Sequence, residues 1–68
     1  MKTLINYDAE ERQMTRLWFN DDNKSTDVRL WETQQLRNRL AGDNRPQANE
    51  IRRMADELIE IFMLGFDN

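Results

Sequence analysis

Cysteine and histidine are absent from this 68-residue chain, which also has only two glycines and one proline. Without cysteine it forms no disulfide, and without either residue the usual zinc sites are excluded, so that only oxygen-ligand metals could bind. A domain this small buries only about 60% of the surface that its unfolded chain exposes, and it commonly relies on disulfides, a metal or oligomerisation. We therefore expect one small domain, residues 1–68, that is supported by oligomerisation.

Long apolar runs are also missing. No stretch approaches the roughly 18 apolar residues of a membrane-spanning helix, and residues 1–5 contain no apolar run of the length found in signal peptides. The lack of cysteine fits a reducing compartment. These absences predict a soluble, cytoplasmic protein that makes no contact with a membrane.

The residues that are present favour helices. Good helix formers (Leu, Arg, Glu, Gln, Met and Ala) supply 33 of the 68 positions, and there is a single valine. Asp8 and Glu11 have the spacing of a capping box, which predicts a first helix that begins after Asp8 and ends near Phe19. That helix would carry three large apolar residues on one side, namely Met14, Leu17 and Trp18.

A second helix is predicted to follow a loop. Residues 20–25 are rich in Asn, Asp and Ser, which bond to their own backbone in turns, and Ser25 or Thr26 could cap the next helix. This helix would reach Ala41, with Gly42 as its left-handed terminator.

The second helix has a rival interpretation. Its apolar side is interrupted by Glu32 and Arg39, and consists of Val28, Trp31, Leu36 and Leu40. Residues 26–30 also alternate between polar and apolar as a strand does. A β-hairpin over residues 14–31, joined by residues 3–7, is therefore the alternative.

The clearest element is a third helix from Pro46 to Phe66. Pro46 suits the first helical position and Gly65 suits a left-handed cap, with Phe66 packing on Ile61. At about 100° per residue the apolar side chains cover an arc of roughly 200°, about twice the width that a helix on a small core needs. These side chains are Ala48, Ile51, Met54, Ala55, Leu58, Ile59, Ile61, Phe62 and Met63.

Together these elements predict an all-α fold, a three-helix domain whose second and third helices form an αα-hairpin. The alternative is an α+β fold, with an N-terminal β-hairpin or meander followed by two helices. The wide apolar face of the third helix predicts a homodimer or higher oligomer, because surplus apolar surface needs a cover. The residues that we expect at that self-association surface are Met54, Leu58, Ile61, Phe62 and Met63.

A second surface is predicted from arginine and tryptophan, which are enriched where proteins bind one another. Arginine outnumbers lysine by eight to two, and the net charge of −3 is uneven, since residues 29–53 are basic whereas residues 54–68 hold four acids and no base. In the helical fold Trp18 and Trp31 would both point inward, whereas in the hairpin they would share an exposed sheet face. The residues that we expect to bind a partner protein are Arg37, Arg39, Arg45, Arg52, Arg53, Trp18 and Trp31.

Nucleic-acid binding is the competing function. The arginines of the turn after Gly42 could neutralise phosphates, and Arg, Gln and Asn are the side chains that read base edges. However, two i,i+4 pairs, Arg52–Asp56 and Arg53–Glu57, would partly neutralise these charges. An acidic chain is also a poor binder of polyanions, which makes a protein the favoured partner.

Residues that could perform chemistry are few. Ser25 lies beside Lys24, but nothing in the sequence marks it as activated. Five oxygen-bearing residues have part of the spacing of a calcium loop, although Thr26 stands where that loop needs glycine; they are Asp21, Asn23, Ser25, Asp27 and Glu32. The sequence thus predicts no enzyme, metal or cofactor, and instead a non-catalytic interaction module, a small regulator, inhibitor or assembly factor that binds a partner protein and itself.

Overall fold

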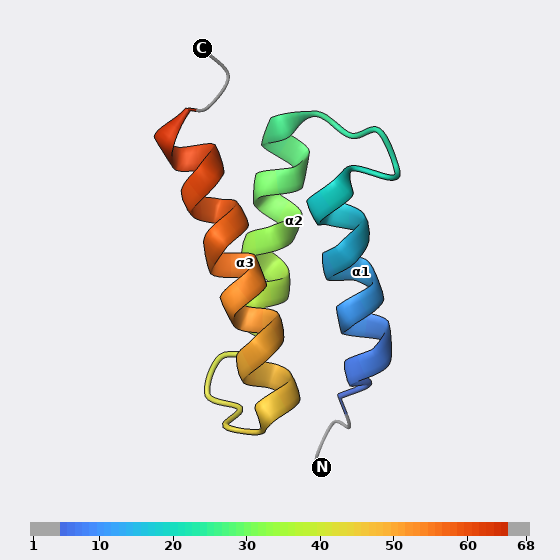
Figure 1. The fold of residues 1–68 in the computed structure, drawn as a ribbon, viewed down its shortest axis with the longest axis vertical. Helices are drawn as coiled ribbons and strands as arrows, with labels where there is room; N and C mark the ends of the chain where they lie inside the picture. The colour runs from blue at the N-terminus through green and yellow to red at the C-terminus, as the bar shows by residue number, and fades with distance from the viewer. Residues whose placement is uncertain (1–4, 66–68) are drawn as a thin grey trace.

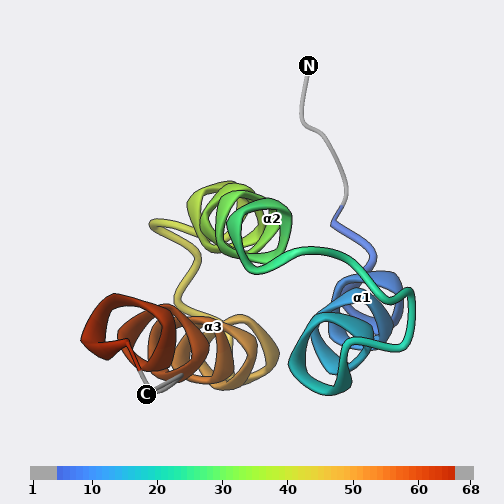
Figure 2. The same cartoon turned by 90° about the horizontal axis from the view of Figure 1, so that it is seen from above.

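The computed structural model describes residues 5–65 and contains three α-helices, α1 (Tyr7–Phe19), α2 (Thr26–Arg39) and α3 (Pro46–Leu64) (Figure 1). The helices alternate in direction along the bundle, so that α2 and α3 form an antiparallel αα-hairpin. Seen from above, the three helices occupy the corners of a triangle (Figure 2). This arrangement confirms the prediction of an all-α, three-helix domain.

The alternative β-hairpin over residues 14–31 is wrong, because side chains in the loop stabilise helix ends instead of a strand turn. The side-chain amide of Asn20 accepts from the backbone N–H of Lys24 at 2.7 Å and donates to the Lys24 carbonyl at 3.1 Å. Ser25 then caps α2, since its hydroxyl oxygen accepts from the backbone N–H of Val28 at 3.3 Å. The strand-like alternation after the loop therefore lies within the first turns of a helix.

Two of the predicted helix ends are displaced. The capping box at Asp8 is wrong, because Asn6 is the N-cap of α1 and accepts from the backbone N–H of Ala9 at 3.1 Å. The end of α2 at Ala41 is also wrong, because the helix ends at Arg39. Its last carbonyls are satisfied by a tighter turn, in which backbone N–H groups bond to carbonyls three residues earlier. Gly42 still has the expected left-handed backbone, with a φ of 85°.

The start of α3 and its glycine cap follow the sequence prediction, although the helix ends at Leu64 and not at the predicted Phe66. Pro46 occupies the first turn, where the missing N–H costs no hydrogen bond. Gly65 is the C-cap with a φ of 67°, and its N–H donates to the Phe62 carbonyl at 3.3 Å. The predicted contact of Phe66 with Ile61 lies outside the described residues.

The core lies along the axis between the three helices, and α3 contributes half of its apolar residues. Thr33 is also fully buried, and its hydroxyl donates to the Arg29 carbonyl at 2.6 Å. Among residues 5–65 no buried side-chain nitrogen or oxygen lacks a hydrogen-bond partner. In the part of the chain that the structure describes, no helix has both the length and the apolar content to cross a membrane. The buried apolar residues are Met14, Leu17, Leu36, Leu40, Ala48, Ile51, Ala55 and Leu58.

A hydrogen-bonded cluster joins the start of α1 to the turn between α2 and α3. The hydroxyl of Tyr7 donates to the carboxylate of Asp43, and the Asp43 carboxylate also accepts from the backbone N–H of Arg45 at 3.1 Å. The bond to Asp43 raises the pKa of Tyr7, and the same bond lowers the pKa of Asp43 from its ordinary value of 3.8. The guanidinium carbon of Arg45 lies 6.0 Å from the centroid of the Tyr7 ring.

This cluster makes the free energy of unfolding depend on pH. Because the pKa of Asp43 is lower in the folded chain, the stabilisation is fully present above pH 3.8 and is lost as the pH falls through the lowered value. Tyr7→Phe removes the donor, so we expect a smaller free energy of unfolding near neutral pH and a smaller loss of it on acidification. Urea unfolding followed by circular dichroism measures both quantities.

Asp43→Asn and the double variant Tyr7→Phe/Asp43→Asn complete a double-mutant cycle. If the hydroxyl and the carboxylate act together, the double variant loses less stability than the sum of the two single variants. Additive losses, or an unchanged acid dependence in Tyr7→Phe, would contradict this role.

Candidate functional site

The exposed apolar side chains gather toward one end of the bundle. Since α1 and α3 run in one direction and α2 in the other, the ends of α1 and α3 and the start of α2 lie at the same end (Figure 1). We call this part of the molecule the apolar end. Five large apolar residues there are between 41% and 70% exposed, namely Phe19, Val28, Trp31, Met63 and Leu64.

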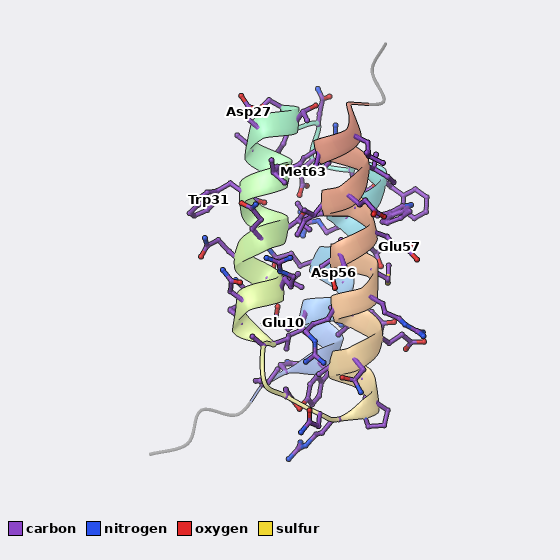
Figure 3. All side chains as sticks on the ribbon, turned by 90° about the vertical axis from the view of Figure 1, so that its left-hand side faces the viewer. Glu10, Asp27, Trp31, Asp56, Glu57 and Met63 are labelled. Carbon is purple, nitrogen blue, oxygen red and sulfur yellow. The ribbon has the colours of Figure 1, made fainter. Side chains whose placement is uncertain are left out.

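Trp31 projects away from the bundle (Figure 3) and is 61% exposed. The prediction that both tryptophans point inward is therefore wrong for Trp31, whereas Trp18 is half-buried and packs against the core. The reason is the register of α2, whose buried side is centred on Thr33 and Leu36. Trp31 precedes Thr33 by two residues, which is about 200° around the helix.

In the last turn of α3, as at Trp31, large apolar side chains face away from the core. Leu58 faces the core, and Met63 follows it by five residues, which turns its side chain about 140° away. Met63 is 70% exposed and Leu64 is 67% exposed. Phe62 remains half-buried, with the guanidinium carbon of Arg29 at 5.0 Å from its ring centroid.

Arg29 holds the apolar end together, a role that the sequence did not reveal. Its guanidinium donates to the backbone carbonyl of Leu17 at 2.7 and 3.0 Å and to that of Trp18 at 3.0 Å. These carbonyls belong to the last turn of α1, where no helical N–H can reach them. Because the side chain also covers Phe62, one residue of α2 links α1 and α3.

The predicted self-association residues do not form one exposed strip. Leu58 is 3% exposed and belongs to the core, while Met54, Ile61 and Phe62 are partly buried against it. Of the five predicted residues, only Met63 is largely exposed to solvent. Most of the wide apolar face of α3 is covered by α1 and α2 of the same chain, and self-association stays a prediction.

Most of the predicted arginine surface is engaged within the chain. Arg37 pairs with Asp56 at 3.3 Å, and Arg39 pairs with Glu10 at 2.8 Å. Arg52 donates to backbone carbonyls of the turn before α3, at 2.6 Å to Leu40 and at 2.5 Å to Asp43.

The expected i,i+4 pairs are replaced by these longer-range contacts, since Asp56 pairs with Arg37 across the two helices. Arg53 is exposed and has no ion pair within residues 5–65. An open depression of about 710 Å³ runs along the first half of α3, and its lining mixes cations, carboxylates and amides: Pro46, Gln47, Asn49, Glu50, Arg52, Arg53 and Asp56. The five arginines therefore do not present one free cationic surface.

Two of the five residues with calcium-loop spacing, Ser25 and Glu32, stabilise the fold, as does Asp22 in the same loop. Glu32 accepts from the ammonium group of Lys24 at 2.9 Å through both carboxylate oxygens, and Ser25 caps α2. Asp22 pairs with Arg16 at 2.6 Å, and that bond lowers the pKa of Asp22. Across residues 5–65 no three acidic residues come together as a metal site.

The apolar end is also acidic. Four exposed carboxylates lie in its helices and loop without an ion-pair partner among the described residues. No basic residue lies in the last turn of α3 to balance the partial negative charge of the helix terminus. The four carboxylates belong to Asp21, Asp27, Glu57 and Glu60.

No known protein family, curated protein or solved structure matches this chain. The candidate site therefore rests on the geometry of the chain alone.

The contacts of Arg29 generate a stability prediction. Arg29→Met keeps an apolar stem but leaves the carbonyls of Leu17 and Trp18 without their charged donor. We expect the free energy of unfolding to fall by about 2 kcal/mol, the usual scale for hydrogen bonds to a charged group. Urea unfolding measures this loss.

Arg12→Met is the matched control, because Arg12 is exposed on α1 and makes no ion pair in the described part of the chain. It should change stability by less than about 0.5 kcal/mol. Equal effects of the two substitutions would show that Arg29 is an ordinary surface residue.

Proposed function

We propose that the chain is a non-catalytic protein-interaction module, a small regulator, inhibitor or assembly factor, and that it binds a partner protein through the apolar end. The supporting observation is that all five large apolar side chains that are exposed among residues 5–65 lie toward that end. Single exposed apolar residues are common on protein surfaces, but a group of them typifies interaction sites.

Trp31 is the residue on which we expect binding to depend most. Tryptophan is enriched among the few interface residues that carry most of the binding energy, because it buries a large area with little loss of rotamer freedom. A tryptophan that is 61% exposed and points away from its own core contributes little to folding. Its side chain is available to a partner.

The competing nucleic-acid function is supported less well. Arg37, Arg39 and Arg52 already bind carboxylates or backbone carbonyls of the same chain, so that phosphate contacts would have to displace these bonds. The proposal also keeps the cytoplasm as the compartment, on the ground that the sequence lacks cysteine.

Affinity capture with a tagged chain tests the proposal. Proteins that the chain retains from a lysate of its own source cells should be lost with Trp31→Ala, because truncating a central tryptophan commonly weakens binding by more than 2 kcal/mol, or about thirtyfold. Quantitative mass spectrometry of the retained proteins measures the loss.

Gln35→Ala is the matched control, since Gln35 is exposed on α2 one turn after Trp31. It should leave the retained proteins unchanged. Retention that Trp31→Ala does not alter, or retention of nucleic acid that Arg53→Ala abolishes, would contradict binding through the apolar end.

A further inference from the structure

The charge of the apolar end identifies the chemistry of its occupant. Resting on the proposed function, we propose that this end binds a basic amphipathic segment of another protein, in which apolar side chains alternate with Lys or Arg. The argument depends on where the unpaired carboxylates lie relative to the exposed apolar residues.

The carboxylates adjoin the apolar side chains on each helix. Asp27 directly precedes Val28 in the first turn of α2, near Trp31 (Figure 3). Glu60 precedes Leu64 by four residues, so both lie on the same side of α3. A segment that covers Trp31 or Leu64 therefore comes within reach of a carboxylate on the same side of the same helix.

The three cations of this end offset only part of that charge, because two of them already pair with other carboxylates. Arg16 binds Asp22, Lys24 binds Glu32, and Arg29 donates to the backbone carbonyls of α1. The C-terminal ends of α1 and α3 add partial negative charge at the same place, which the N-terminal end of α2 offsets only in part. The apolar end thus presents apolar surface bordered by net negative charge.

This charge disfavours the two other occupants. A second copy that docked symmetrically through the same surface would place the acidic surface that holds Asp27, Glu57 and Glu60 against the same acidic surface of the other copy. Nucleic acid would bring phosphates toward the same carboxylates. Like charges opposed across an interface are unfavourable, whereas lysines and arginines around an apolar segment complement the site.

Two synthetic helical peptides provide the test. One carries leucine and lysine at helical spacing, and the other has glutamate in place of every lysine. We expect the chain to bind the lysine peptide in fluorescence anisotropy, to ignore the glutamate peptide, and to bind more weakly as salt is added. Trp31→Ala should weaken binding by about tenfold or more, and Gln35→Ala should not change it.

The charge contribution is tested separately with Asp27→Asn combined with Glu60→Gln, whose fold is checked by circular dichroism. This variant should bind the lysine peptide severalfold more weakly at low salt, and it should show a smaller salt dependence. Equal binding of the two peptides, binding of neither peptide, or no effect of the charge variant would overturn the proposal.

The result separates this inference from the proposed function. If Trp31→Ala releases a captured partner but the charge variant retains it fully, the apolar end is a binding site whose occupant is not basic. If light scattering instead shows a dimer that forms with rising concentration and is abolished by Trp31→Ala, the occupant is a second copy, and the inference is wrong.

Discussion

The structure depends on how one face of α3 is shared between two shorter helices. Ala48, Ile51, Ala55 and Leu58 form half of the apolar core, and α1 and α2 pack on either side of them (Figure 2). Because α3 has 19 residues whereas α1 has 13 and α2 has 14, its apolar face can be covered along most but not all of its length. The uncovered part lies at the apolar end, where the candidate site is.

Arginine side chains link the helices in this chain, which has no cysteine or histidine for a disulfide or a zinc site. Arg29 donates to the last carbonyls of α1, and Arg52 donates to carbonyls of the turn between α2 and α3. Each guanidinium donates to backbone carbonyls at or just beyond a helix end, and it bridges two elements at the same time. Residues that the sequence suggested for an external partner are thus partly used to hold the fold.

The helices could be predicted from the sequence because their signals are local. Pro46, Gly65 and Ser25 have the backbone preferences that start or end a helix, and the apolar periodicity of α3 is strong. The buried side of α2 could not be predicted. Its apolar positions spread over a broad arc, and only packing decided that Leu36 would be buried while Trp31 was left outside.

The site was predicted only in part, for the same physical reason. Trp31 and Met63 were expected to be binding residues and are exposed, whereas Leu58 was expected at an interface and is buried in the core. The contacts of Arg29 and Arg52 join residues that are 9 to 12 positions apart, and their partners are backbone carbonyls. No residue pattern marks such an acceptor, so only the three-dimensional arrangement reveals it.

The exposure of Trp31 in the free chain is the most direct test of this account. In a Trp18→Phe variant Trp31 is the only fluorophore of its kind, and its emission and quenching by acrylamide can be recorded while light scattering gives the mass at several concentrations. The account predicts that Trp31 fluorescence is typical of a solvent-exposed indole and is readily quenched at every concentration, including any at which the mass rises. A mass that rises with concentration while Trp31 becomes shielded would contradict it, because the apolar end would then be covered by a second copy of the chain.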